Sequence, residues 1–276
     1  MSLTQDSGRF FFELALGLYA ALACTPRRAI GPGFTRVMTA FVLASLVPAW
    51  FLARAEGGAA PERLGALAFG ALVVATFALA GRLPVAADRL LVLVATGVGI
   101  ASMLTAVHAG FGAAAAAAPT LLLVSSAGSM LVLGLVTGAM ILGHWYLVTP
   151  DLAVAHLGRL TKLALAATYL KVGLLAATVC LLPDAFLASA RAFGGAFGAS
   201  DDGGGAPFQA RLDFLWLLAR VLIGLAGPAV LCHMTLATVK LKATQPATGI
   251  LYAATVMVLM GELFAFVGER SFGVVL

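Results

Sequence analysis

Two histidines stand near the ends of long apolar segments of the sequence, His144 and His233. If both segments cross a membrane in the same direction, the two imidazoles lie at similar depth, about one to two helical turns from one membrane face. Neutral imidazoles that approach from two helices are the axial ligands of a b-type haem. Small residues that would make room for the ring occur on both segments: Gly134, Gly138, Gly143, Gly224 and Gly227. We therefore predict haem iron ligation by His144 and His233 as one use of this pair.

The same residues have a plainer interpretation, which the sequence leaves open. Gly134 and Gly138 are spaced as in a helix-packing motif, and a histidine at a helix end often only caps carbonyl groups. Trp145 and Tyr146 follow His144 directly. They are typical of the aromatic belt at a membrane interface, and they are also placed to stack on a cofactor or bond to it.

A second set of ionisable residues is expected toward the opposite membrane face: Glu13, His108, Arg220 and Glu262, with Lys171 nearer the middle. Each costs several kcal/mol in lipid unless it is paired or hydrated, so such residues are usually functional. Glu262 continues a stripe with Thr248 and Thr255 on one helical face. We predict a polar layer that binds a quinone head group, with the acid or the imidazole taking the hydroquinone proton. A structural ion pair between the last three segments is the alternative.

The composition defines the class of protein. Hydrophobic residues make up 62% of the chain and charged residues 11%, and the mean hydropathy is +1.04. A soluble domain carries about 25% charged residues, so the chain is predicted to be a polytopic membrane protein with the lipid bilayer as its main partner. No basic run with interleaved aromatic residues exists, which argues against a nucleic-acid partner. The three cysteines (Cys24, Cys180 and Cys232) lie in separate apolar segments and are expected to be small core residues.

The predicted fold is all-α, a single transmembrane domain over residues 1–276 with about eight membrane-spanning helices. The expected helices cover residues 9–25, 34–53, 62–81, 89–112, 119–148, 157–183, 213–239 and 248–268. These runs are continuously apolar and lack the alternation of a membrane β-barrel. The connection 184–212 reads as a flexible outer loop. Its stretch 186–197 is predicted to be either a helix on the membrane surface or a disordered linker.

Loop charges predict the orientation in a bacterial-type inner membrane. One set of alternate loops holds nine basic residues (Arg27, Arg28, Arg36, Arg82, Arg89, Arg159, Lys162, Lys240 and Lys242) against two acidic ones (Asp88 and Asp151). The other set holds six basic residues (Arg9, Arg54, Arg63, Arg191, Arg211 and Arg270) against eight acidic ones (Asp6, Glu56, Glu62, Asp184, Asp201, Asp202, Asp213 and Glu269). Since basic loops stay in the cytoplasm, both termini are expected outside.

Sequence motifs of other chemistries are absent or incomplete, so no enzymatic reaction is assigned. Neither a zinc-protease, hydrolase, nucleotide nor dinucleotide motif occurs in a suitable context. Asp201 and Asp202 form a pair without a third metal ligand. Gly227-Pro228 and Pro48 are candidate helix breaks of a transporter, but they do not correspond in any repeat.

The last segment, Gly249 to Phe272, ends in the motif Gly261-Glu262-Leu263. In this it resembles the final helix of the membrane anchor subunits of complexes of the DMSO reductase and polysulfide reductase type. The Gly-Arg that normally follows the motif is absent, and Gly268-Glu269-Arg270 comes later. The resemblance implies quinol exchange with partner redox subunits, usually without haem in the anchor.

The leading functional prediction is an integral membrane subunit of a respiratory or photosynthetic electron-transfer complex that interacts with quinone or b-type haem. Other subunits of that complex would be its partners. A non-catalytic structural or assembly subunit, and a small-solute transporter, are the alternatives.

Overall fold

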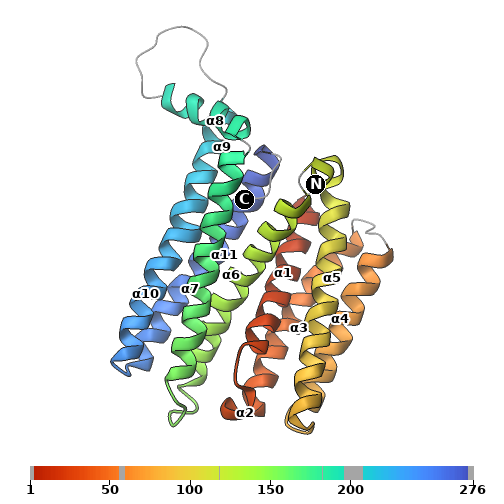
Figure 1. Cartoon of the computed structure of the whole chain (residues 1–276), viewed down its shortest axis with the longest axis vertical. Helices are drawn as coiled ribbons and strands as arrows, with labels where there is room; N and C mark the ends of the chain where they lie inside the picture. Colours follow the sequence, from red (N-terminus) through yellow and green to blue (C-terminus); the bar gives the residue numbers. More distant parts are fainter. Residues whose placement is uncertain (1–2, 56–59, 118, 182, 196–207, 273–276) are drawn as a thin grey trace.

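The computed structural model describes residues 3–55, 60–117, 119–181, 183–195 and 208–272, and every regular element in these ranges is a helix. The elements are α1 (Leu3–Ala23), α2 (Arg27–Ile30), α3 (Pro32–Ala55), α4 (Ala60–Leu79), α5 (Val85–Ala117), α6 (Pro119–Trp145), α7 (Ala155–Leu181), α8 (Pro183–Gly195), α9 (Phe208–Ala219), the π-helix η1 (Arg220–Ala226), α10 (Gly227–Lys240) and α11 (Thr244–Phe272). The long helices run side by side, and both termini lie at the same end of the bundle (Figure 1).

The helices agree with the predicted all-α architecture, and six stretches of the described chain are long and apolar enough to cross a membrane. They are Pro32–Ala55, Val85–Thr105, Leu123–Trp145, Ala155–Leu181, Leu212–Lys240 and Thr244–Glu269. The other two predicted segments correspond to α1, which carries charged residues, and α4, whose apolar stretch Arg63–Leu79 is shorter. Eight membrane crossings therefore stay a prediction.

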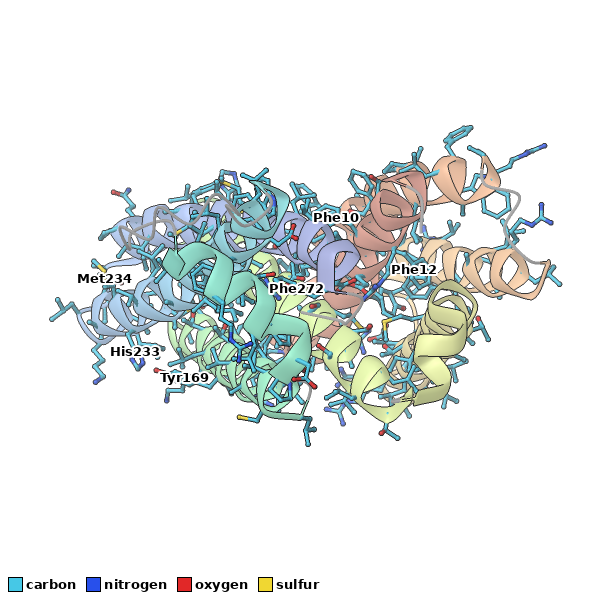
Figure 2. All side chains as sticks on the ribbon, turned by 90° about the horizontal axis from the view of Figure 1, so that it is seen from above. Phe10, Phe12, Tyr169, His233, Met234 and Phe272 are labelled. Atoms are coloured by element: carbon cyan, nitrogen blue, oxygen red, sulfur yellow. The ribbon has the colours of Figure 1, made fainter. Side chains whose placement is uncertain are left out.

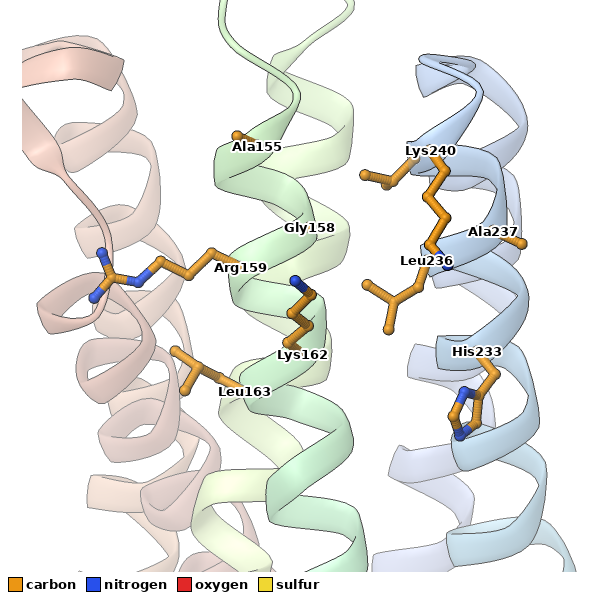
Figure 3. A pocket seen from close by; sticks show the side chains of 10 residues that line it. Ala155, Gly158, Arg159, Lys162, Leu163, His233, Leu236, Ala237 and Lys240 are labelled. Carbon is orange, nitrogen blue, oxygen red and sulfur yellow. The ribbon is translucent and has the colours of Figure 1, made fainter.

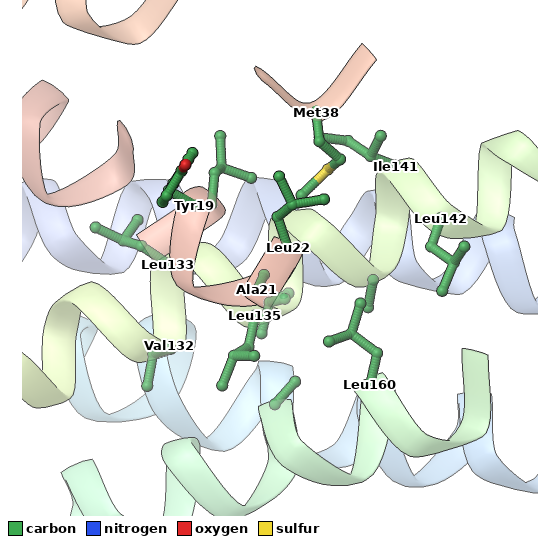
Figure 4. Packing of buried hydrophobic residues seen from close by; sticks show 14 of the residues in the cluster. Tyr19, Ala21, Leu22, Met38, Val132, Leu133, Leu135, Ile141, Leu142 and Leu160 are labelled. Carbon is green, nitrogen blue, oxygen red and sulfur yellow. The ribbon is translucent and has the colours of Figure 1, made fainter. Parts of the chain in front are cut away.

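Helix α1 lies in the middle of the bundle. It packs against α3, α5 and α6 and also touches α11. Its residues from Ala15 to Leu22 are buried, and Ala21 and Leu22 share one apolar cluster with Met38 and Leu160 from other helices (Figure 4). Because protein surrounds α1, its charged residues can find partners that lipid would not offer.

Glycines allow the closest approaches of α1 and α6. Gly17 and Gly134 meet backbone to backbone, and a Cβ atom on Gly138 would lie 2.8 Å from the Cβ of Ala21. Gly17 and Ala21 are four residues apart, as are Gly134 and Gly138, so one small-residue pair packs on the other. The packing interpretation of these glycines is confirmed.

Neighbouring residues also occupy the space beside the remaining glycines that were expected to make room for a haem. Gly143 faces Thr248, Gly227 faces Met257, and Gly224 packs on the backbone of Gly261. The space beside each glycine is used for close helix packing.

The segment after α7 contains a short helix. α8 lies across the end of the bundle (Figure 1), and its Phe186 ring is 4.9 Å from that of Phe272 in α11. The prediction of a helix in the outer loop therefore holds as far as residue 195. The rest of the predicted loop up to residue 207, with Asp201 and Asp202, lies outside the described residues.

The Gly17–Gly134 contact predicts a strong effect of side-chain size. Gly134→Leu should destabilise the protein by about 3 kcal/mol or more, because a side chain there meets backbone that cannot move aside. The measurement is the melting temperature and the yield of monodisperse protein in detergent. Gly97→Leu is the matched control, since Gly97 is exposed and no atom of the described residues lies within 4 Å of an added Cβ. Equal losses in both variants would contradict the packing described here.

The placement of the connections predicts opposite labelling of the two bundle ends. In a chain with Cys24, Cys180 and Cys232 replaced by Ala, Arg191→Cys in α8 should react with an impermeant maleimide on intact cells. Lys242→Cys, between α10 and α11, should react only after permeabilisation, since basic loops stay in the cytoplasm. The reverse pattern would place both termini in the cytoplasm.

Candidate functional site

In the described part of the chain, six ionisable side chains are buried together in the half of the bundle that contains the termini. This charged cluster consists of Arg9, Glu13, Lys171, Arg220, Glu262 and Glu269, which come from α1, α7, η1 and α11 and interact electrostatically with one another. Lys171 and Arg220 have no exposed surface, and the Arg9 side chain is 8% exposed. With three acids and three bases, the formal charges cancel. The cancellation is what allows six charges in an apolar bundle, since an unpaired buried charge is very costly.

Arg9 connects three helices. Its Nε donates to Glu13 Oε1 at 2.7 Å, Nη1 to Glu269 Oε2 at 3.0 Å, and Nη2 to Ser126 Oγ at 2.9 Å. The guanidinium also lies over the Phe266 ring, 5.2 Å from its centroid. Every nitrogen of the guanidinium is therefore satisfied, and α1 is tied to α6 and α11 at one point.

Arg220 and Glu262 form the second ion pair, between η1 and α11. Arg220 Nη2 donates to Glu262 Oε1 at 2.7 Å. Gly224 and Gly261 bring the two helices into backbone contact beside the pair, and a Cβ on Gly224 would lie 3.0 Å from Arg220 Nη1. The π-helix starts at Arg220, and such wide turns occur often at functional sites.

Lys171 binds the first serine of an adjacent pair on α6. Its Nζ donates to Ser125 Oγ at 2.6 Å and to the Ser125 carbonyl at 3.0 Å. Its stem lies against Gly128, where an added Cβ would be 3.2 Å from Lys171 Cδ. Ser125 therefore accepts a hydrogen bond from Lys171 of α7, while Ser126 accepts one from Arg9 of α1.

Three polar atoms of the charged cluster have no hydrogen-bond partner in the described part of the chain. They are Glu13 Oε2 and the Nε and Nη1 atoms of Arg220. A buried polar group without a partner costs about 1–3 kcal/mol, and more for a charged group. The cluster thus has one unpaired hydrogen-bond acceptor and two unpaired donor nitrogens. Water could pair with all three, and so could a ligand that carries both a carbonyl oxygen and a hydroxyl group.

The structure brings together four of the five residues that the sequence assigned to this layer: Glu13, Lys171, Arg220 and Glu262. The side chain of the fifth, His108, lies outside the described residues. Sequence reasoning missed Arg9 and Glu269, which it placed among the loop charges. Two features of the sequence could have identified them. Arg9 lies one helical turn before Glu13. Glu269 continues the stripe of Thr248, Thr255 and Glu262, in which successive residues are seven positions apart.

The two histidines lie on separate helix pairs. His144 on α6 has its Nδ1 3.2 Å from the hydroxyl of Tyr252 on α11. His233 on α10 has its Nε2 2.7 Å from the hydroxyl of Tyr169 on α7, and Figure 2 labels this second pair. Both imidazoles are exposed at the outside of the bundle. The geometry thus provides each imidazole with a tyrosine partner of its own.

Trp145 and Tyr146 pack into the protein, where an aromatic belt would face the interface. The Trp145 ring lies 6.0 Å from that of Phe34 and covers Gly33. Tyr146 is 2% exposed, and its hydroxyl donates to the Ala153 carbonyl at 2.6 Å. Burial raises the pKa of the Tyr146 phenol, which keeps it a neutral donor that closes the turn between α6 and α7.

Metal chemistry has no structural support in the described ranges, which hold no group of three or more histidine, cysteine or carboxylate side chains able to share an ion. Cys232 is buried, as expected for a core residue, while Cys24 and Cys180 are exposed.

Comparison of the chain with known protein families, with curated proteins and with solved structures found no match.

The Arg220–Glu262 pair predicts strong coupling between two substitutions. Arg220→Met or Glu262→Leu alone should destabilise the protein by about 3–5 kcal/mol, because each leaves a buried charge unpaired. The double variant should be more stable than either single variant. The measurement is a double-mutant cycle of thermal unfolding in detergent. Additive losses would contradict a direct pair, and Glu262→Gln, which keeps an acceptor, should cost less than Glu262→Leu.

Proposed function

We propose that the chain is an integral membrane subunit of an electron-transfer complex, and that the charged cluster is the place where a quinone head group exchanges protons. A quinone carbonyl accepts hydrogen bonds, and the hydroquinone hydroxyl donates one. Oxidation of the hydroquinone releases two protons and two electrons, so the site needs a proton acceptor. The electrons would pass to a redox centre in a partner subunit.

The observation that carries this proposal is the set of unused polar atoms on Arg220 and Glu13. Two N–H groups of Arg220 match the acceptor of a quinone, and Glu13 Oε2 matches the donor of a hydroquinone. Both residues are fully buried, so a proton transferred there is shielded from bulk water.

The energy of burial also favours a role beyond holding helices together. Well-packed apolar residues in place of a buried ion pair are often neutral or stabilising, by about 1–4 kcal/mol. The Gly17–Gly134 and Gly224–Gly261 contacts hold helices together without the desolvation cost of buried charges. Three acids and three bases in one cluster fit a site in which protons move.

The resemblance of the last helix to quinol-oxidising anchor subunits points to the same residue. Glu262, the middle of the Gly-Glu-Leu motif, is the partner of Arg220. The arrangement of His144 and His233 supplies no matching argument for haem, because each imidazole has a separate tyrosine partner. Quinone is therefore the cofactor that we propose.

Quinone binding tests the proposal. A photoreactive azidobenzoquinone should label the full-length protein in membrane vesicles, on peptides that border the charged cluster. Arg220→Lys keeps the charge but removes the planar donors, and should weaken labelling about 10-fold or more, as expected for hydrogen bonds from a charged group. Arg27→Lys is the matched control, since Arg27 pairs with Asp88 at the other end of the bundle.

Two outcomes would count against the quinone site. If an excess of unlabelled quinone does not displace the label, or if Arg220→Lys and Arg27→Lys label equally, the cluster does not bind quinone. Loss of folding in Arg220→Lys is separated from loss of binding by its melting temperature. A stable variant with unchanged labelling would leave the cluster as a structural tie.

A further inference from the structure

A groove of about 790 Å³ opens between α7 and α10 at the end of the bundle opposite the termini. Figure 3 shows its two walls, with Lys162 on α7 and His233, Leu236 and Lys240 on α10, while Leu163 extends from the side of α7 that faces away from α10. None of these residues belongs to the charged cluster, and the groove is independent of the proposed quinone site.

Two contacts delimit the groove along the bundle axis. Near the helix ends, Gly158 packs against Val239, where an added Cβ would lie 3.1 Å from Val239 Cγ1. Deeper in the bundle, the Tyr169 hydroxyl and His233 Nε2 are 2.7 Å apart. Lys240 is two helical turns from His233, so the groove runs about 10 Å along α10.

The charge of the groove is positive and uncompensated. Its lining includes Arg159, Lys162 and Lys240 and no acidic residue. In Figure 3 the Lys162 ammonium lies on the side of α7 that faces α10, while Arg159 extends to the far side of α7. No salt bridge of these three residues is found in the described part of the chain. The nearest acid in sequence, Asp151, is exposed in the preceding turn.

The start of α7 adds to the positive field. Lys162 and Arg159 lie within the first turns of a helix that begins at Ala155, and its first turn contains no acid. A helix N-terminus carries about half a positive charge, so cations there repel it and an anion is stabilised. An anion in the groove would satisfy both the lysines and the helix end.

The walls of the groove are apolar below the lysines. Leu236 lines the α10 wall below Lys240, and the neighbouring side chains Val230, Met234 and Leu170 are exposed on the outside of the bundle. An occupant must therefore be anionic at one end and apolar at the other. A free inorganic anion matches only the first requirement.

We propose that this groove binds an anionic phospholipid, with the phosphate between Lys162 and Lys240 and the first part of an acyl chain against Leu236. Basic pockets between membrane helices are known to hold anionic lipid head groups. The bound lipid would fill the space between α7 and α10 and stabilise their contact.

The test is the thermal stability of the full-length protein in neutral detergent with added lipid. Phosphatidylglycerol should raise the melting temperature at low mole fraction, and phosphatidylcholine should not. In Lys162→Gln/Lys240→Gln the apparent affinity for phosphatidylglycerol should fall about 25-fold, at about 5-fold for each lysine. The matched control is Arg28→Gln/Arg89→Gln, which removes the same charge from exposed positions at the same end of the bundle and should retain the affinity.

Other outcomes would overturn the proposal. An equal loss of affinity in both double variants would mean attraction to the whole basic end of the bundle. Stabilisation by inorganic phosphate or glycerol phosphate to the same extent as by lipid would assign the groove to a soluble anion. If the double lysine variant is too unstable to measure, native mass spectrometry of Leu236→Trp, which fills the groove without changing its charge, should show loss of the bound lipid. Retention of the lipid in that variant would contradict the site.

Discussion

The pairing of buried charges constrains the rest of the structure. Burial of the Arg9 guanidinium in an apolar bundle requires hydrogen-bond partners, which are Glu13, Glu269 and Ser126. These three residues come from three different helices. α1 must therefore lie inside the bundle, within reach of both α6 and α11. The Gly17–Gly134 contact allows that approach, since a larger residue at either position would hold the helices too far apart. The ion pairs and the glycine contacts depend on one another.

The same coupling of charge and small residues is repeated at the second ion pair. Gly224 and Gly261 place η1 on α11, and Arg220 reaches Glu262 beside this contact. Long charged side chains thus fill the space beside points where two helix backbones approach closely. These contacts are the same whether the cluster binds a quinone or only holds the helices together. The two roles differ in whether the unpaired polar atoms of Arg220 and Glu13 form hydrogen bonds with a ligand.

The sequence predicted the helices well because long apolar runs leave few alternatives in a membrane. Depth along a helix was also predictable by counting residues, which is why Glu13, Lys171, Arg220 and Glu262 were assigned to one layer. Rotation about the helix axis was not, because it depends on which neighbours each helix has. The haem hypothesis required His144 and His233 to face one another, which residue counting could not test. In the structure the two imidazoles bond to different tyrosines. A glycine likewise shows that space is needed, but not whether a cofactor or another backbone fills it, as Gly134 and Gly17 illustrate.

The cancellation of charge in the cluster has a consequence for how a membrane potential acts on it. A potential does work on net charge, about 2.3 kcal/mol for one elementary charge moved through 100 mV. Three acids and three bases present no net charge, so in a bundle that spans a bilayer the resting cluster would be nearly insensitive to the voltage. One added or removed proton changes this, and the free energy of that single step then depends on voltage in proportion to the depth of the cluster. Protonation of the cluster is thus the event that the electric field of an energised membrane can favour or oppose.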